Sequence, residues 1–368
     1  MTRPRVALAH DYLTQRGGAE RVVLSLLKAF PDAPLYTNLY DPDGTFPEFR
    51  DARIITSGLN RVGFLRRDHR KALPLLAVST NSLRIDADVV VASSTGWAHG
   101  FPTTGRKLVY CHSPARFLYL SEQYLGDAPV LSPARLALRA LRPALIRWDQ
   151  RAARSADRYL CNSSVIRQRI RDVYGIDAEV VPPPAGVRAE GDRAPVASLQ
   201  DWVDEGWYQV VSRLMPYKNV QQVVEAFRGL PDKLVIIGRG PLGAELRPTL
   251  PPNVRLFEGL SDTELRWAYA HSRALIAASH EDFGLTPLEA GAFGKPCLAL
   301  HAGGYLDTIA PGVNGAFFPQ ATPEAIRDAV AAHRGSAWDV PAILQHVDAF
   351  SEDRFIARLR AAVADLAR

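Results

Sequence analysis

Two carboxylates eight residues apart, Glu281 and Glu289, frame a stretch that could bind a ligand carrying several hydroxyl groups. Before them, residues 273–279 form a short apolar run that is typical of a buried parallel strand. After Glu281, Thr286 and Pro287 predict the start of a helix, with Thr286 as the N-cap residue. Because helix N-termini attract anions while carboxylates accept hydrogen bonds from hydroxyls, the pattern favours a ligand with an anionic centre and hydroxylated ends. A nucleotide sugar has this shape.

The spacing of Thr286 and Glu289 also fits a capping box. In that interpretation the Glu289 carboxylate only accepts a hydrogen bond from the backbone N–H of Thr286, and no ligand is needed. The pattern is common before apolar runs, so the local residues leave both interpretations open.

A second group of candidate residues is basic. Residues 208–212 predict a strand that delivers Arg213 and Lys218 into the next loop, just before a helix expected near Asn219. Arginine binds oxyanions through two N–H groups, and lysine acts as a compact point charge. The two cations therefore suit a diphosphate leaving group, with ordinary surface charge as the alternative.

A glycine pair, Gly17 and Gly18, stands between a strand predicted at 5–10 and a helix predicted at 20–30. A glycine-rich turn at the start of a helix lets the backbone approach a phosphate. Loop flexibility is the more frequent reason for such a pair, and it stays as the alternative.

Polar residues also end two strands that the sequence predicts at 88–94 and 107–112. Because the carboxyl ends of parallel strands meet at one edge of a sheet, Ser93 and His112 should lie together where a ligand binds. Arg116 follows and adds a cation. A lone histidine is more often structural than catalytic, but a place at a strand end favours ligand contact.

The elements that must position these residues alternate between apolar strands and amphipathic helices. This alternation predicts an α/β fold of doubly wound parallel sheets, and 368 residues suffice for two domains. We expect a Rossmann-like acceptor-binding domain at 1–184, a Pro- and Gly-rich linker at 185–206, a nucleotide-sugar-binding domain at 207–349 and a final helix at 350–368.

The composition excludes several classes of protein. No apolar run approaches the ~20 residues of a membrane span, and no signal-peptide core follows Met1, so we expect a cytoplasmic protein. The three cysteines are odd in number and widely spaced, which favours buried thiols over disulfides or a zinc site. No nucleic-acid module is recognisable, and nucleic acid is not an expected partner.

Charge is concentrated in the first half of the chain. Residues 1–184 hold 26 Lys and Arg against 17 Asp and Glu, a net charge of +9. Two basic amphipathic segments, 61–76 and 132–158, contribute to it. Such segments are usually solvated helix faces, and the alternative is an interfacial helix that docks on anionic lipid. The second interpretation predicts peripheral contact with the inner face of the membrane.

Three motifs together resemble one known family. They are Glu281-x7-Glu289 with internal Phe283-Gly284-Leu285 and trailing Gly291, Ser212-Arg213-Leu214-x3-Lys218, and His112-Ser113-Pro114-x-Arg116. The chain resembles retaining glycosyltransferases of the GT-B fold, specifically glycosyltransferase family 4, and the third motif is similar to that of a bacterial polysaccharide subgroup with mannosyltransferases. The resemblance covers nearly the whole chain. It implies two Rossmann-like domains facing a central cleft, with a C-terminal helix that crosses back to the first domain.

The resemblance also implies roles for individual residues. Glu281 would face the hydroxyls of the donor sugar, and Glu289 would hold the ribose. The Gly17-Gly18 loop would reach toward the donor diphosphate, and His112 would contact the donor sugar. The expected catalytic residues are His112, Arg213, Lys218 and Glu281. The other donor-binding residues are Gly238 and Gly259 near the base, with Phe283, Gly284, Leu285 and Thr286. Asp307 stands where family members often carry a glutamate, which leaves its contact open.

The expected function is therefore transfer of a hexose, with retention, to a hydroxyl of a glycan or lipid-linked acceptor. The subgroup resemblance implies mannose from GDP-mannose. We expect no metal or other cofactor, because the two D-x-D strings, 41–43 and 86–88, fall in a turn and at the N-terminal end of a strand. A UDP-hexose donor, a sugar-nucleotide epimerase of the same fold and a non-catalytic nucleotide-sugar-binding protein are the alternatives.

Overall fold

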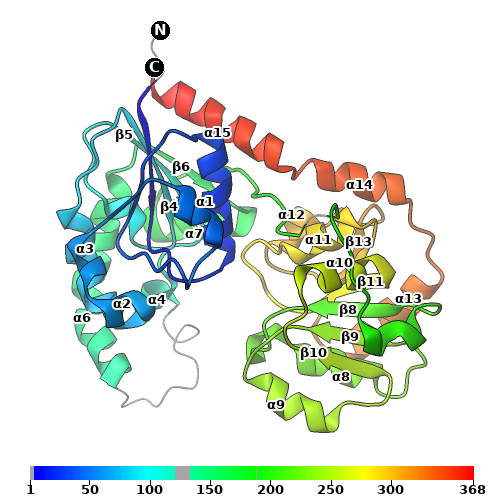
Figure 1. Ribbon diagram of the computed structural model, residues 1–368. Helices are drawn as coiled ribbons and strands as arrows, with labels where there is room; N and C mark the ends of the chain where they lie inside the picture. The colour runs from blue at the N-terminus through cyan, green and yellow to red at the C-terminus, as the bar shows by residue number, and fades with distance from the viewer. Residues whose placement is uncertain (1–3, 121–132, 188) are drawn as a thin grey trace. The chain divides into compact units, whose positions relative to one another are not determined.

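The structure is a computed structural model that describes residues 4–120, 133–187 and 189–368 (Figure 1). The chain divides into two compact units. The first comprises Met1–Pro183 and Glu352–Arg368, and the second comprises Pro184–Ser351. The last helix therefore belongs to the first unit, although it follows the second unit in sequence.

A seven-stranded sheet in the order β3-β2-β1-β4-β5-β6-β7 forms the centre of the first unit. Its strands are β1 (Val6–His10), β2 (Leu35–Thr37), β3 (Ile54–Thr56), β4 (Val89–Ser94), β5 (Arg106–Cys111), β6 (Arg158–Cys161) and β7 (Glu179–Val180). All neighbours pair in parallel. Strand β4 is buried at every position, because helices cover both faces of the sheet and only apolar or paired residues are stable there.

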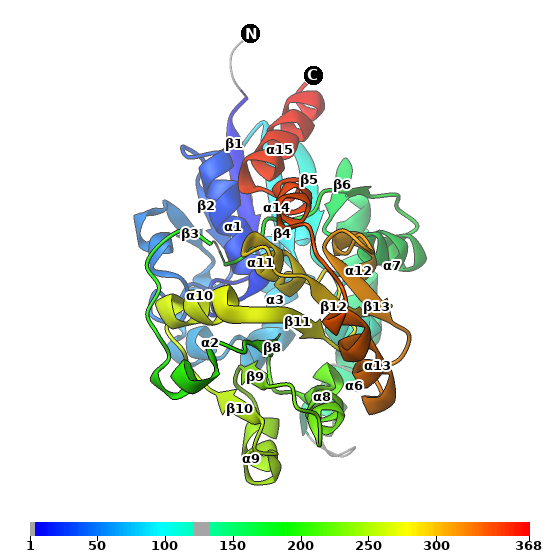
Figure 2. The ribbon, with the colours of Figure 1, turned by 90° about the vertical axis from the view of Figure 1, so that its right-hand side faces the viewer.

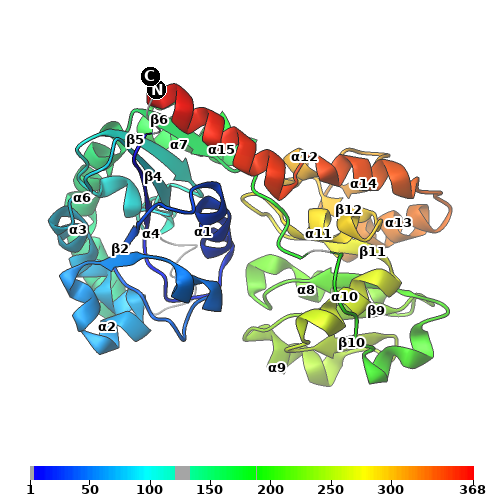
Figure 3. The same cartoon turned by 45° about the horizontal axis from the view of Figure 1, so that its top comes forward.

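The helices of the first unit lie on both faces of its sheet (Figure 3). They are α1 (Gly18–Ala29), α2 (Gly63–Arg67), α3 (Leu73–Ser82), α4 (Arg116–Tyr119), α6 (Pro133–Arg154), α7 (Ser164–Tyr174) and α15 (Glu352–Leu366). Helices α1 and α15 pack against one face, while α6 and α7 pack against the other. Among the described residues, no helix combines the length and the apolar character that crossing a membrane requires.

The C-terminal helix α15 is held to the first unit by apolar and polar contacts, and it lies beside α1 in Figures 1 and 2. The buried ring of Phe355 meets Tyr110 edge-on, with 5.5 Å between ring centroids. At the start of the helix, the Glu352 carboxylate accepts hydrogen bonds from Ser25 at 2.7 Å and from Lys28 at 2.8 Å. Its place on the first unit therefore rests on core packing and two polar contacts.

The second unit contains a six-stranded parallel sheet in the order β10-β9-β8-β11-β12-β13, which can be followed in Figure 2. Its strands are β8 (Trp207–Val211), β9 (Leu234–Ile237), β10 (Val254–Phe257), β11 (Ser272–Ala277), β12 (Cys297–Leu300) and β13 (Gly315–Phe318). Its helices are α8 (Val220–Phe227), α9 (Leu242–Leu246), α10 (Asp262–His271), α11 (Thr286–Ala292), α12 (Tyr305–Thr308), α13 (Pro323–Arg334) and α14 (Val340–Asp348).

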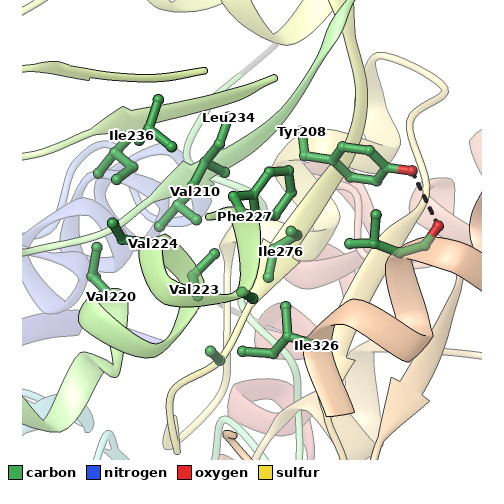
Figure 4. Packing of buried hydrophobic residues seen from close by; sticks show 14 of the residues in the cluster. Tyr208, Val210, Val220, Val223, Val224, Phe227, Leu234, Ile236, Ile276 and Ile326 are labelled. Atoms are coloured by element: carbon green, nitrogen blue, oxygen red, sulfur yellow. Dashed lines mark hydrogen bonds between the residues drawn. The ribbon is translucent and has the colours of Figure 1, made fainter. Parts of the chain in front are cut away.

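The main core of the second unit fills the space between the sheet and helices α8 and α13 (Figure 4). Phe227 of α8 packs against Tyr208 of β8, with ring centroids 5.6 Å apart. The Tyr208 hydroxyl is buried, and it meets the carbonyl oxygen of Val330 at 3.4 Å and His333 Nδ1 at 2.9 Å. The core thus keeps its one tyrosine hydroxyl paired, as burial of a polar group requires.

The fold confirms the predicted α/β class of two doubly wound parallel sheets. The three cysteines are buried free thiols, as predicted. Part of the segment that composition assigned to the linker is ordered: residues 197–202 form a short 3-10 helix whose Leu199 and Trp202 pack against Trp207 and Trp267.

The basic segment 61–76 is not one amphipathic helix, so this prediction was wrong. It is divided into a 3-10 turn ending at Arg61, helix α2, a second 3-10 turn over His69–Ala72 and the start of α3. Helix α2 ends at a non-helical Asp68. Pro74 lacks an N–H and suits the first turn of a helix, so a new helix begins there. In the second basic segment, helix α6 ends at Arg154, Arg158 already belongs to β6, and Ser132 lies outside the described residues.

Candidate active site

Lys218 and Glu281 meet at the carboxyl edge of the second sheet. The Lys218 ammonium forms an ion pair with Glu281 Oε1, and the Ser279 hydroxyl donates a hydrogen bond to the same oxygen at 2.6 Å. The side chain of Lys218 is 9% exposed and that of Glu281 is 27% exposed. The pair is thus largely desolvated but still open on one side, which suits contact with a polar ligand.

The order of the strands explains this meeting. Lys218 lies in the loop after β8 and Glu281 in the loop after β11, and these strands are parallel neighbours. Asn219 joins the two loops, because its side-chain N–H donates to the carbonyl oxygen of Ala278 at 2.8 Å. Asn219 has a left-handed backbone with φ of 55°, which an asparagine adopts more readily than most residues. Helix α8 begins directly after it, as predicted.

Arg213 lies apart from the ion pair. Its guanidinium is exposed and donates a hydrogen bond to the hydroxyl of Tyr217 at 2.7 Å. The Lys218 ammonium lies 5.2 Å from the centroid of the same tyrosine ring. Tyr217 therefore contacts both cations, and it was not singled out from the sequence.

Glu289 is buried in the first turn of α11, and its carboxylate accepts a hydrogen bond from the Tyr269 hydroxyl at 3.1 Å. Thr286 is not the N-cap residue, so this prediction was wrong. The preceding Leu285 already has helical backbone angles, takes the N-cap position, and accepts a hydrogen bond from the backbone N–H of Glu289 at 3.0 Å. The side chain of Glu289 is directed to Tyr269 of α10, which the local sequence could not reveal.

The glycine pair Gly303-Gly304 allows a close approach of two loops. A Cβ atom on Gly303 would collide with the carbonyl oxygen of Glu281, and one on Gly304 would collide with the backbone of Phe283. The Gly304 N–H donates to the Glu281 carbonyl oxygen at 2.8 Å. Tyr305 follows, and its hydroxyl lies 3.1 Å from that of Ser279. Ser279 and Tyr305 therefore support Glu281, and neither was identified as a site residue from the sequence.

The remaining predicted residues of the second unit lie in the loops at this edge or near it. Phe283 is buried, and Gly284 has a left-handed backbone with φ of 84° against the ring of Tyr305. Gly238 directly follows β9, and Gly259 follows β10 by one residue. Asp307 is half-buried in α12.

The first unit has a polar cluster of its own at the carboxyl edge of its sheet. His10 ends β1, Ser93 lies in β4 and His112 follows β5, and these three strands are neighbours. The Ser93 hydroxyl oxygen lies 2.8 Å from His112 Nε2 and 3.1 Å from His10 Nδ1. The expected meeting of Ser93 and His112 is confirmed, and His10 joins them.

Glu20 extends this cluster from the first turn of α1. Its Oε1 atom lies 3.8 Å from His10 Nε2 and accepts a hydrogen bond from Gln15 at 3.0 Å. Burial alone would lower the pKa of His10, but the hydrogen bond and charge of Glu20 outweigh it and raise that pKa. Gly17 is the N-cap of α1 and Gly18 its first residue, and the Glu20 carboxylate lies against Gly17.

Burial changes the chemistry of His112. It lowers the pKa of His112 to about 4, and the charge of His10 lowers it further, while Asp11 and Glu20 act in the opposite direction. His112 is therefore neutral near pH 7. Arg116, the other predicted member of its motif, lies exposed at the start of α4.

Asp11 has a structural role beside this cluster. Its carboxylate accepts hydrogen bonds from the backbone N–H groups of Thr95 at 2.5 Å, Trp97 at 3.0 Å and Ala98 at 2.5 Å. These bonds fix the loop after β4. Within the part of the chain that the structure describes, no three His, Cys, Asp or Glu residues form a cluster that could hold a metal ion.

Comparison with known proteins agrees with this architecture. A model described as Glycosyltransferase Family 4 matches residues 16–187, and one described as Glycosyl transferases group 1 matches residues 204–333. The chain belongs to the GT-B glycosyltransferases. Its first unit carries the family 4 domain, and its second unit carries the group 1 domain.

Curated relatives are similar over parts of the chain. The D-rhamnosyltransferase WbpZ of Pseudomonas aeruginosa is 28% identical over 211 residues, which are 53% of this chain and 54% of that protein. The glycogen synthase of the same organism is 36% identical over 132 residues, 33% of this chain and 26% of that protein. The D-inositol 3-phosphate glycosyltransferase of Mycobacterium tuberculosis is 28% identical over 185 residues, 45% of this chain and 38% of that protein. The chain thus spans about half or less of the length of these relatives.

Solved structures match over the whole chain. HepE from Anabaena, in complex with UDP-glucose, superposes with a TM-score of 0.66 at 16% identity and covers 98% of this chain and 100% of its own. Sucrose-phosphate synthase from Thermosynechococcus elongatus superposes with a TM-score of 0.68 at 17% identity and covers 98% and 99%. At this identity the likeness shows the GT-B fold.

Proposed function

We propose that the protein is a retaining glycosyltransferase that moves a hexosyl group from a nucleoside diphosphate sugar to a hydroxyl of a glycan or lipid-linked acceptor. The observation that carries the proposal is the Lys218–Glu281 pair at the carboxyl edge of the second sheet. It combines a cation for a diphosphate with a carboxylate for sugar hydroxyls, and ligands of parallel α/β sheets bind at this edge. The named transferase relatives support the same class of reaction.

In the proposed reaction, the bond from the anomeric carbon to the diphosphate oxygen breaks, and its electron pair leaves with the diphosphate. The acceptor oxygen forms the new bond on the same face of the sugar. Because that face also holds the departing diphosphate, its oxygen is the nearest base for the acceptor proton. The main task of the protein is then to stabilise negative charge that develops on the leaving oxygen.

Lys218 and Arg213 are the cations that we assign to this task. The Lys218 ammonium has three N–H groups, so it can keep Glu281 as a partner and still donate to a phosphate oxygen. Arg213 is exposed, and its planar guanidinium can bind two oxygens at once. We therefore propose catalysis without a metal ion, in which fixed cations neutralise the diphosphate.

The donor we propose is GDP-mannose, supported by the resemblance of the His112–Arg116 motif to polysaccharide mannosyltransferases. A UDP-hexose is the second candidate, because HepE, with the same fold, was crystallised with UDP-glucose. An epimerase or a non-catalytic binding protein would not need both a diphosphate cation pair and an acceptor.

We further propose that the first unit contacts an anionic membrane, where a lipid-linked acceptor would lie. Four exposed apolar side chains support this: Val62, Phe64, Leu75 and Val78. Exposed Arg61, Arg67 and Lys71 lie in the same part of the chain. Apolar residues beside basic ones are the pattern of interfacial segments that bind anionic lipid.

Thermal unfolding with GDP, UDP, ADP and dTDP, each with EDTA or Mg²⁺, tests the proposal. A ligand at 100 times its Kd stabilises a native protein by ~2.7 kcal/mol. A shift with GDP alone, unchanged by EDTA, supports GDP-mannose, whereas a shift with UDP alone replaces it by a UDP-hexose. No shift with any nucleotide would overturn the proposed function. Transfer from the bound donor, with the anomeric configuration read by NMR, then separates a retaining transferase from an epimerase or a binding protein.

A further inference from the structure

The hydrogen bonds around His112 determine which of its ring nitrogens carries the proton. His10 Nδ1 lies 3.0 Å from the backbone carbonyl oxygen of Ser93. A carbonyl oxygen only accepts hydrogen bonds, so His10 must carry a proton on Nδ1. The same nitrogen lies 3.1 Å from the Ser93 hydroxyl oxygen. That oxygen therefore accepts from His10, and its own proton is directed elsewhere.

The next partner of the Ser93 hydroxyl is His112 Nε2, at 2.8 Å. Because the hydroxyl proton points to this nitrogen, His112 Nε2 acts as the acceptor and the ring proton of neutral His112 lies on Nδ1. No hydrogen bond connects Nδ1 of His112 to any residue that the structure describes. The side chain is buried but for 9% of its surface. Its Nδ1–H group is therefore available to an acceptor atom of a ligand.

We propose that Glu20, His10 and Ser93 hold His112 as the neutral Nδ1–H tautomer, so that His112 donates a fixed hydrogen bond to a substrate oxygen and transfers no proton. Glu20 anchors the far end, 3.8 Å from His10 Nε2. Ser93, His10 and Glu20 are thus positioning residues that act through His112. The tautomer follows from this cluster alone, whereas its use on a substrate rests on the proposed function.

The charged groups around His112 act in the same sense. His10 and Asp11 face it from β1 and the residue after it, and Glu20 faces it from α1. From the other side come only an amide and an aromatic edge: Asn162 donates to the His112 carbonyl oxygen at 3.2 Å, and the Tyr110 ring lies 5.2 Å from the imidazole. Protonated His112 would need Ser93 to accept at Nε2 while it also accepts from His10. The neutral form avoids this conflict.

NMR of protein labelled with ¹⁵N-histidine tests the tautomer directly, since two-bond ¹⁵N–¹H correlations distinguish Nδ1–H from Nε2–H. The His112 signals are assigned as those that H112N removes. The expected result is an Nδ1–H tautomer that does not titrate between pH 6 and 8. An Nε2–H tautomer in the unchanged protein, or titration of His112 within that range, would overturn the proposal without any variant of the cluster having to fold.

Variants then test the positioning role. Ser93→Ala should mix the tautomers of His112, and Ser93→Thr, which keeps the hydroxyl, should restore the Nδ1–H form. Ser155→Ala is the matched control, because this serine accepts from Lys107, away from the cluster, at 2.9 Å. An unchanged tautomer in Ser93→Ala would show that Ser93 does not set it.

The substrate role is tested by two amides that differ in reach. Counted in bonds from Cβ, the N–H of Asn occupies the place of Nδ1, and that of Gln occupies the place of Nε2. We expect H112N to keep transfer within about threefold and H112Q to lose about tenfold more, the effect of one hydrogen bond. Equal loss in both would overturn the donor role. Because nucleotide binding is measured separately, failure of the proposed function remains distinguishable from failure of the tautomer.

Discussion

The ammonium of Lys218 and the carboxylate of Glu281 form an ion pair across 63 residues of sequence. Both side chains are held from outside the pair. Asn219 ties the Lys218 loop to Ala278, and Ser279 donates to Glu281. A preorganised pair of this kind can receive a charged ligand with little rearrangement, because its orientation is already determined by the two loops.

We expect Lys218→Ala to destabilise the protein by about 1–3 kcal/mol, because it leaves a partly buried carboxylate without its cation. Transfer should fall at least about 100-fold if Lys218 also stabilises the leaving diphosphate. Urea unfolding and initial rates measure the two effects. Lys233→Ala is the matched control: its partner Glu205 is 68% exposed, so the cost should stay below about 1 kcal/mol. Equal effects of the two substitutions would argue against a special role for Lys218.

Tyr269→Phe removes the hydroxyl that holds the Glu289 carboxylate. Loss of this buried hydrogen bond should cost about 1–3 kcal/mol of stability. If Glu289 holds the ribose, nucleotide affinity should also fall several-fold, which calorimetric titration can measure. Tyr208→Phe is a control in the same unit, because its hydroxyl bonds only to Val330 and His333. It should lower stability alone, and unchanged nucleotide affinity in Tyr269→Phe would remove Glu289 from the binding site.

The stability of the protein should depend on pH through His112, whose pKa burial lowers from 6.5 to about 4. Below pH 6.5 the unfolded chain binds a proton that the folded protein does not bind until about pH 4. The stabilising contribution is therefore complete above pH 6.5 and is lost as the pH falls toward 4. The raised pKa of His10 acts in the opposite direction: its contribution is complete below pH 6.5 and is lost as the pH rises through the folded pKa.

Comparison of the unchanged protein with H112N isolates the His112 contribution, because His10 is present in both. The difference in their free energies of unfolding should change by on the order of 3 kcal/mol between pH 6.5 and 4. Urea unfolding at intervals of pH measures it. A difference that stays constant over this range would contradict a lowered pKa for His112.

Gly303→Ala should unfold or inactivate the second unit, because the new Cβ would collide with the carbonyl oxygen of Glu281. Its backbone also has φ of 65°, which costs a non-glycine residue about 1 kcal/mol. Gly229→Ala separates the two effects, since Gly229 has φ of 82° with open space around it. The control should lose only the backbone cost. A similarly small loss in Gly303→Ala would show that the two loops can separate freely.

Phe64→Ser combined with Val78→Ser should weaken binding to vesicles that contain anionic lipid, because both side chains are more than half exposed and apolar. Sedimentation with phosphatidylglycerol vesicles, compared with purely zwitterionic ones, measures this. Leu344→Ser is the control, since it removes an apolar side chain that is 44% exposed in the second unit. Unchanged sedimentation of the double variant would contradict the proposed membrane contact.

Much of the architecture could be predicted from the chain alone, because the signals are local. Apolar runs such as 88–94 indicate buried strands, and Asn219 before an amphipathic stretch indicates a helix start. Polar residues that end such runs, including Ser93 and His112, could be placed at the ligand-binding edge for the same reason.

The partners of these residues depended on the tertiary structure. The order of strands places β1 beside β4 and β8 beside β11, and no local pattern encodes that order. It brings His10 to Ser93 across 83 residues and Lys218 to Glu281 across 63. Glu289 could be assigned to a capping box or to a ligand from its spacing, and only the packing of α10 against α11 directed it to Tyr269. The sequence thus determined which chemistry is present and at which edge of each sheet. The fold decided which groups touch, because contacts between distant residues arise only when the sheets assemble.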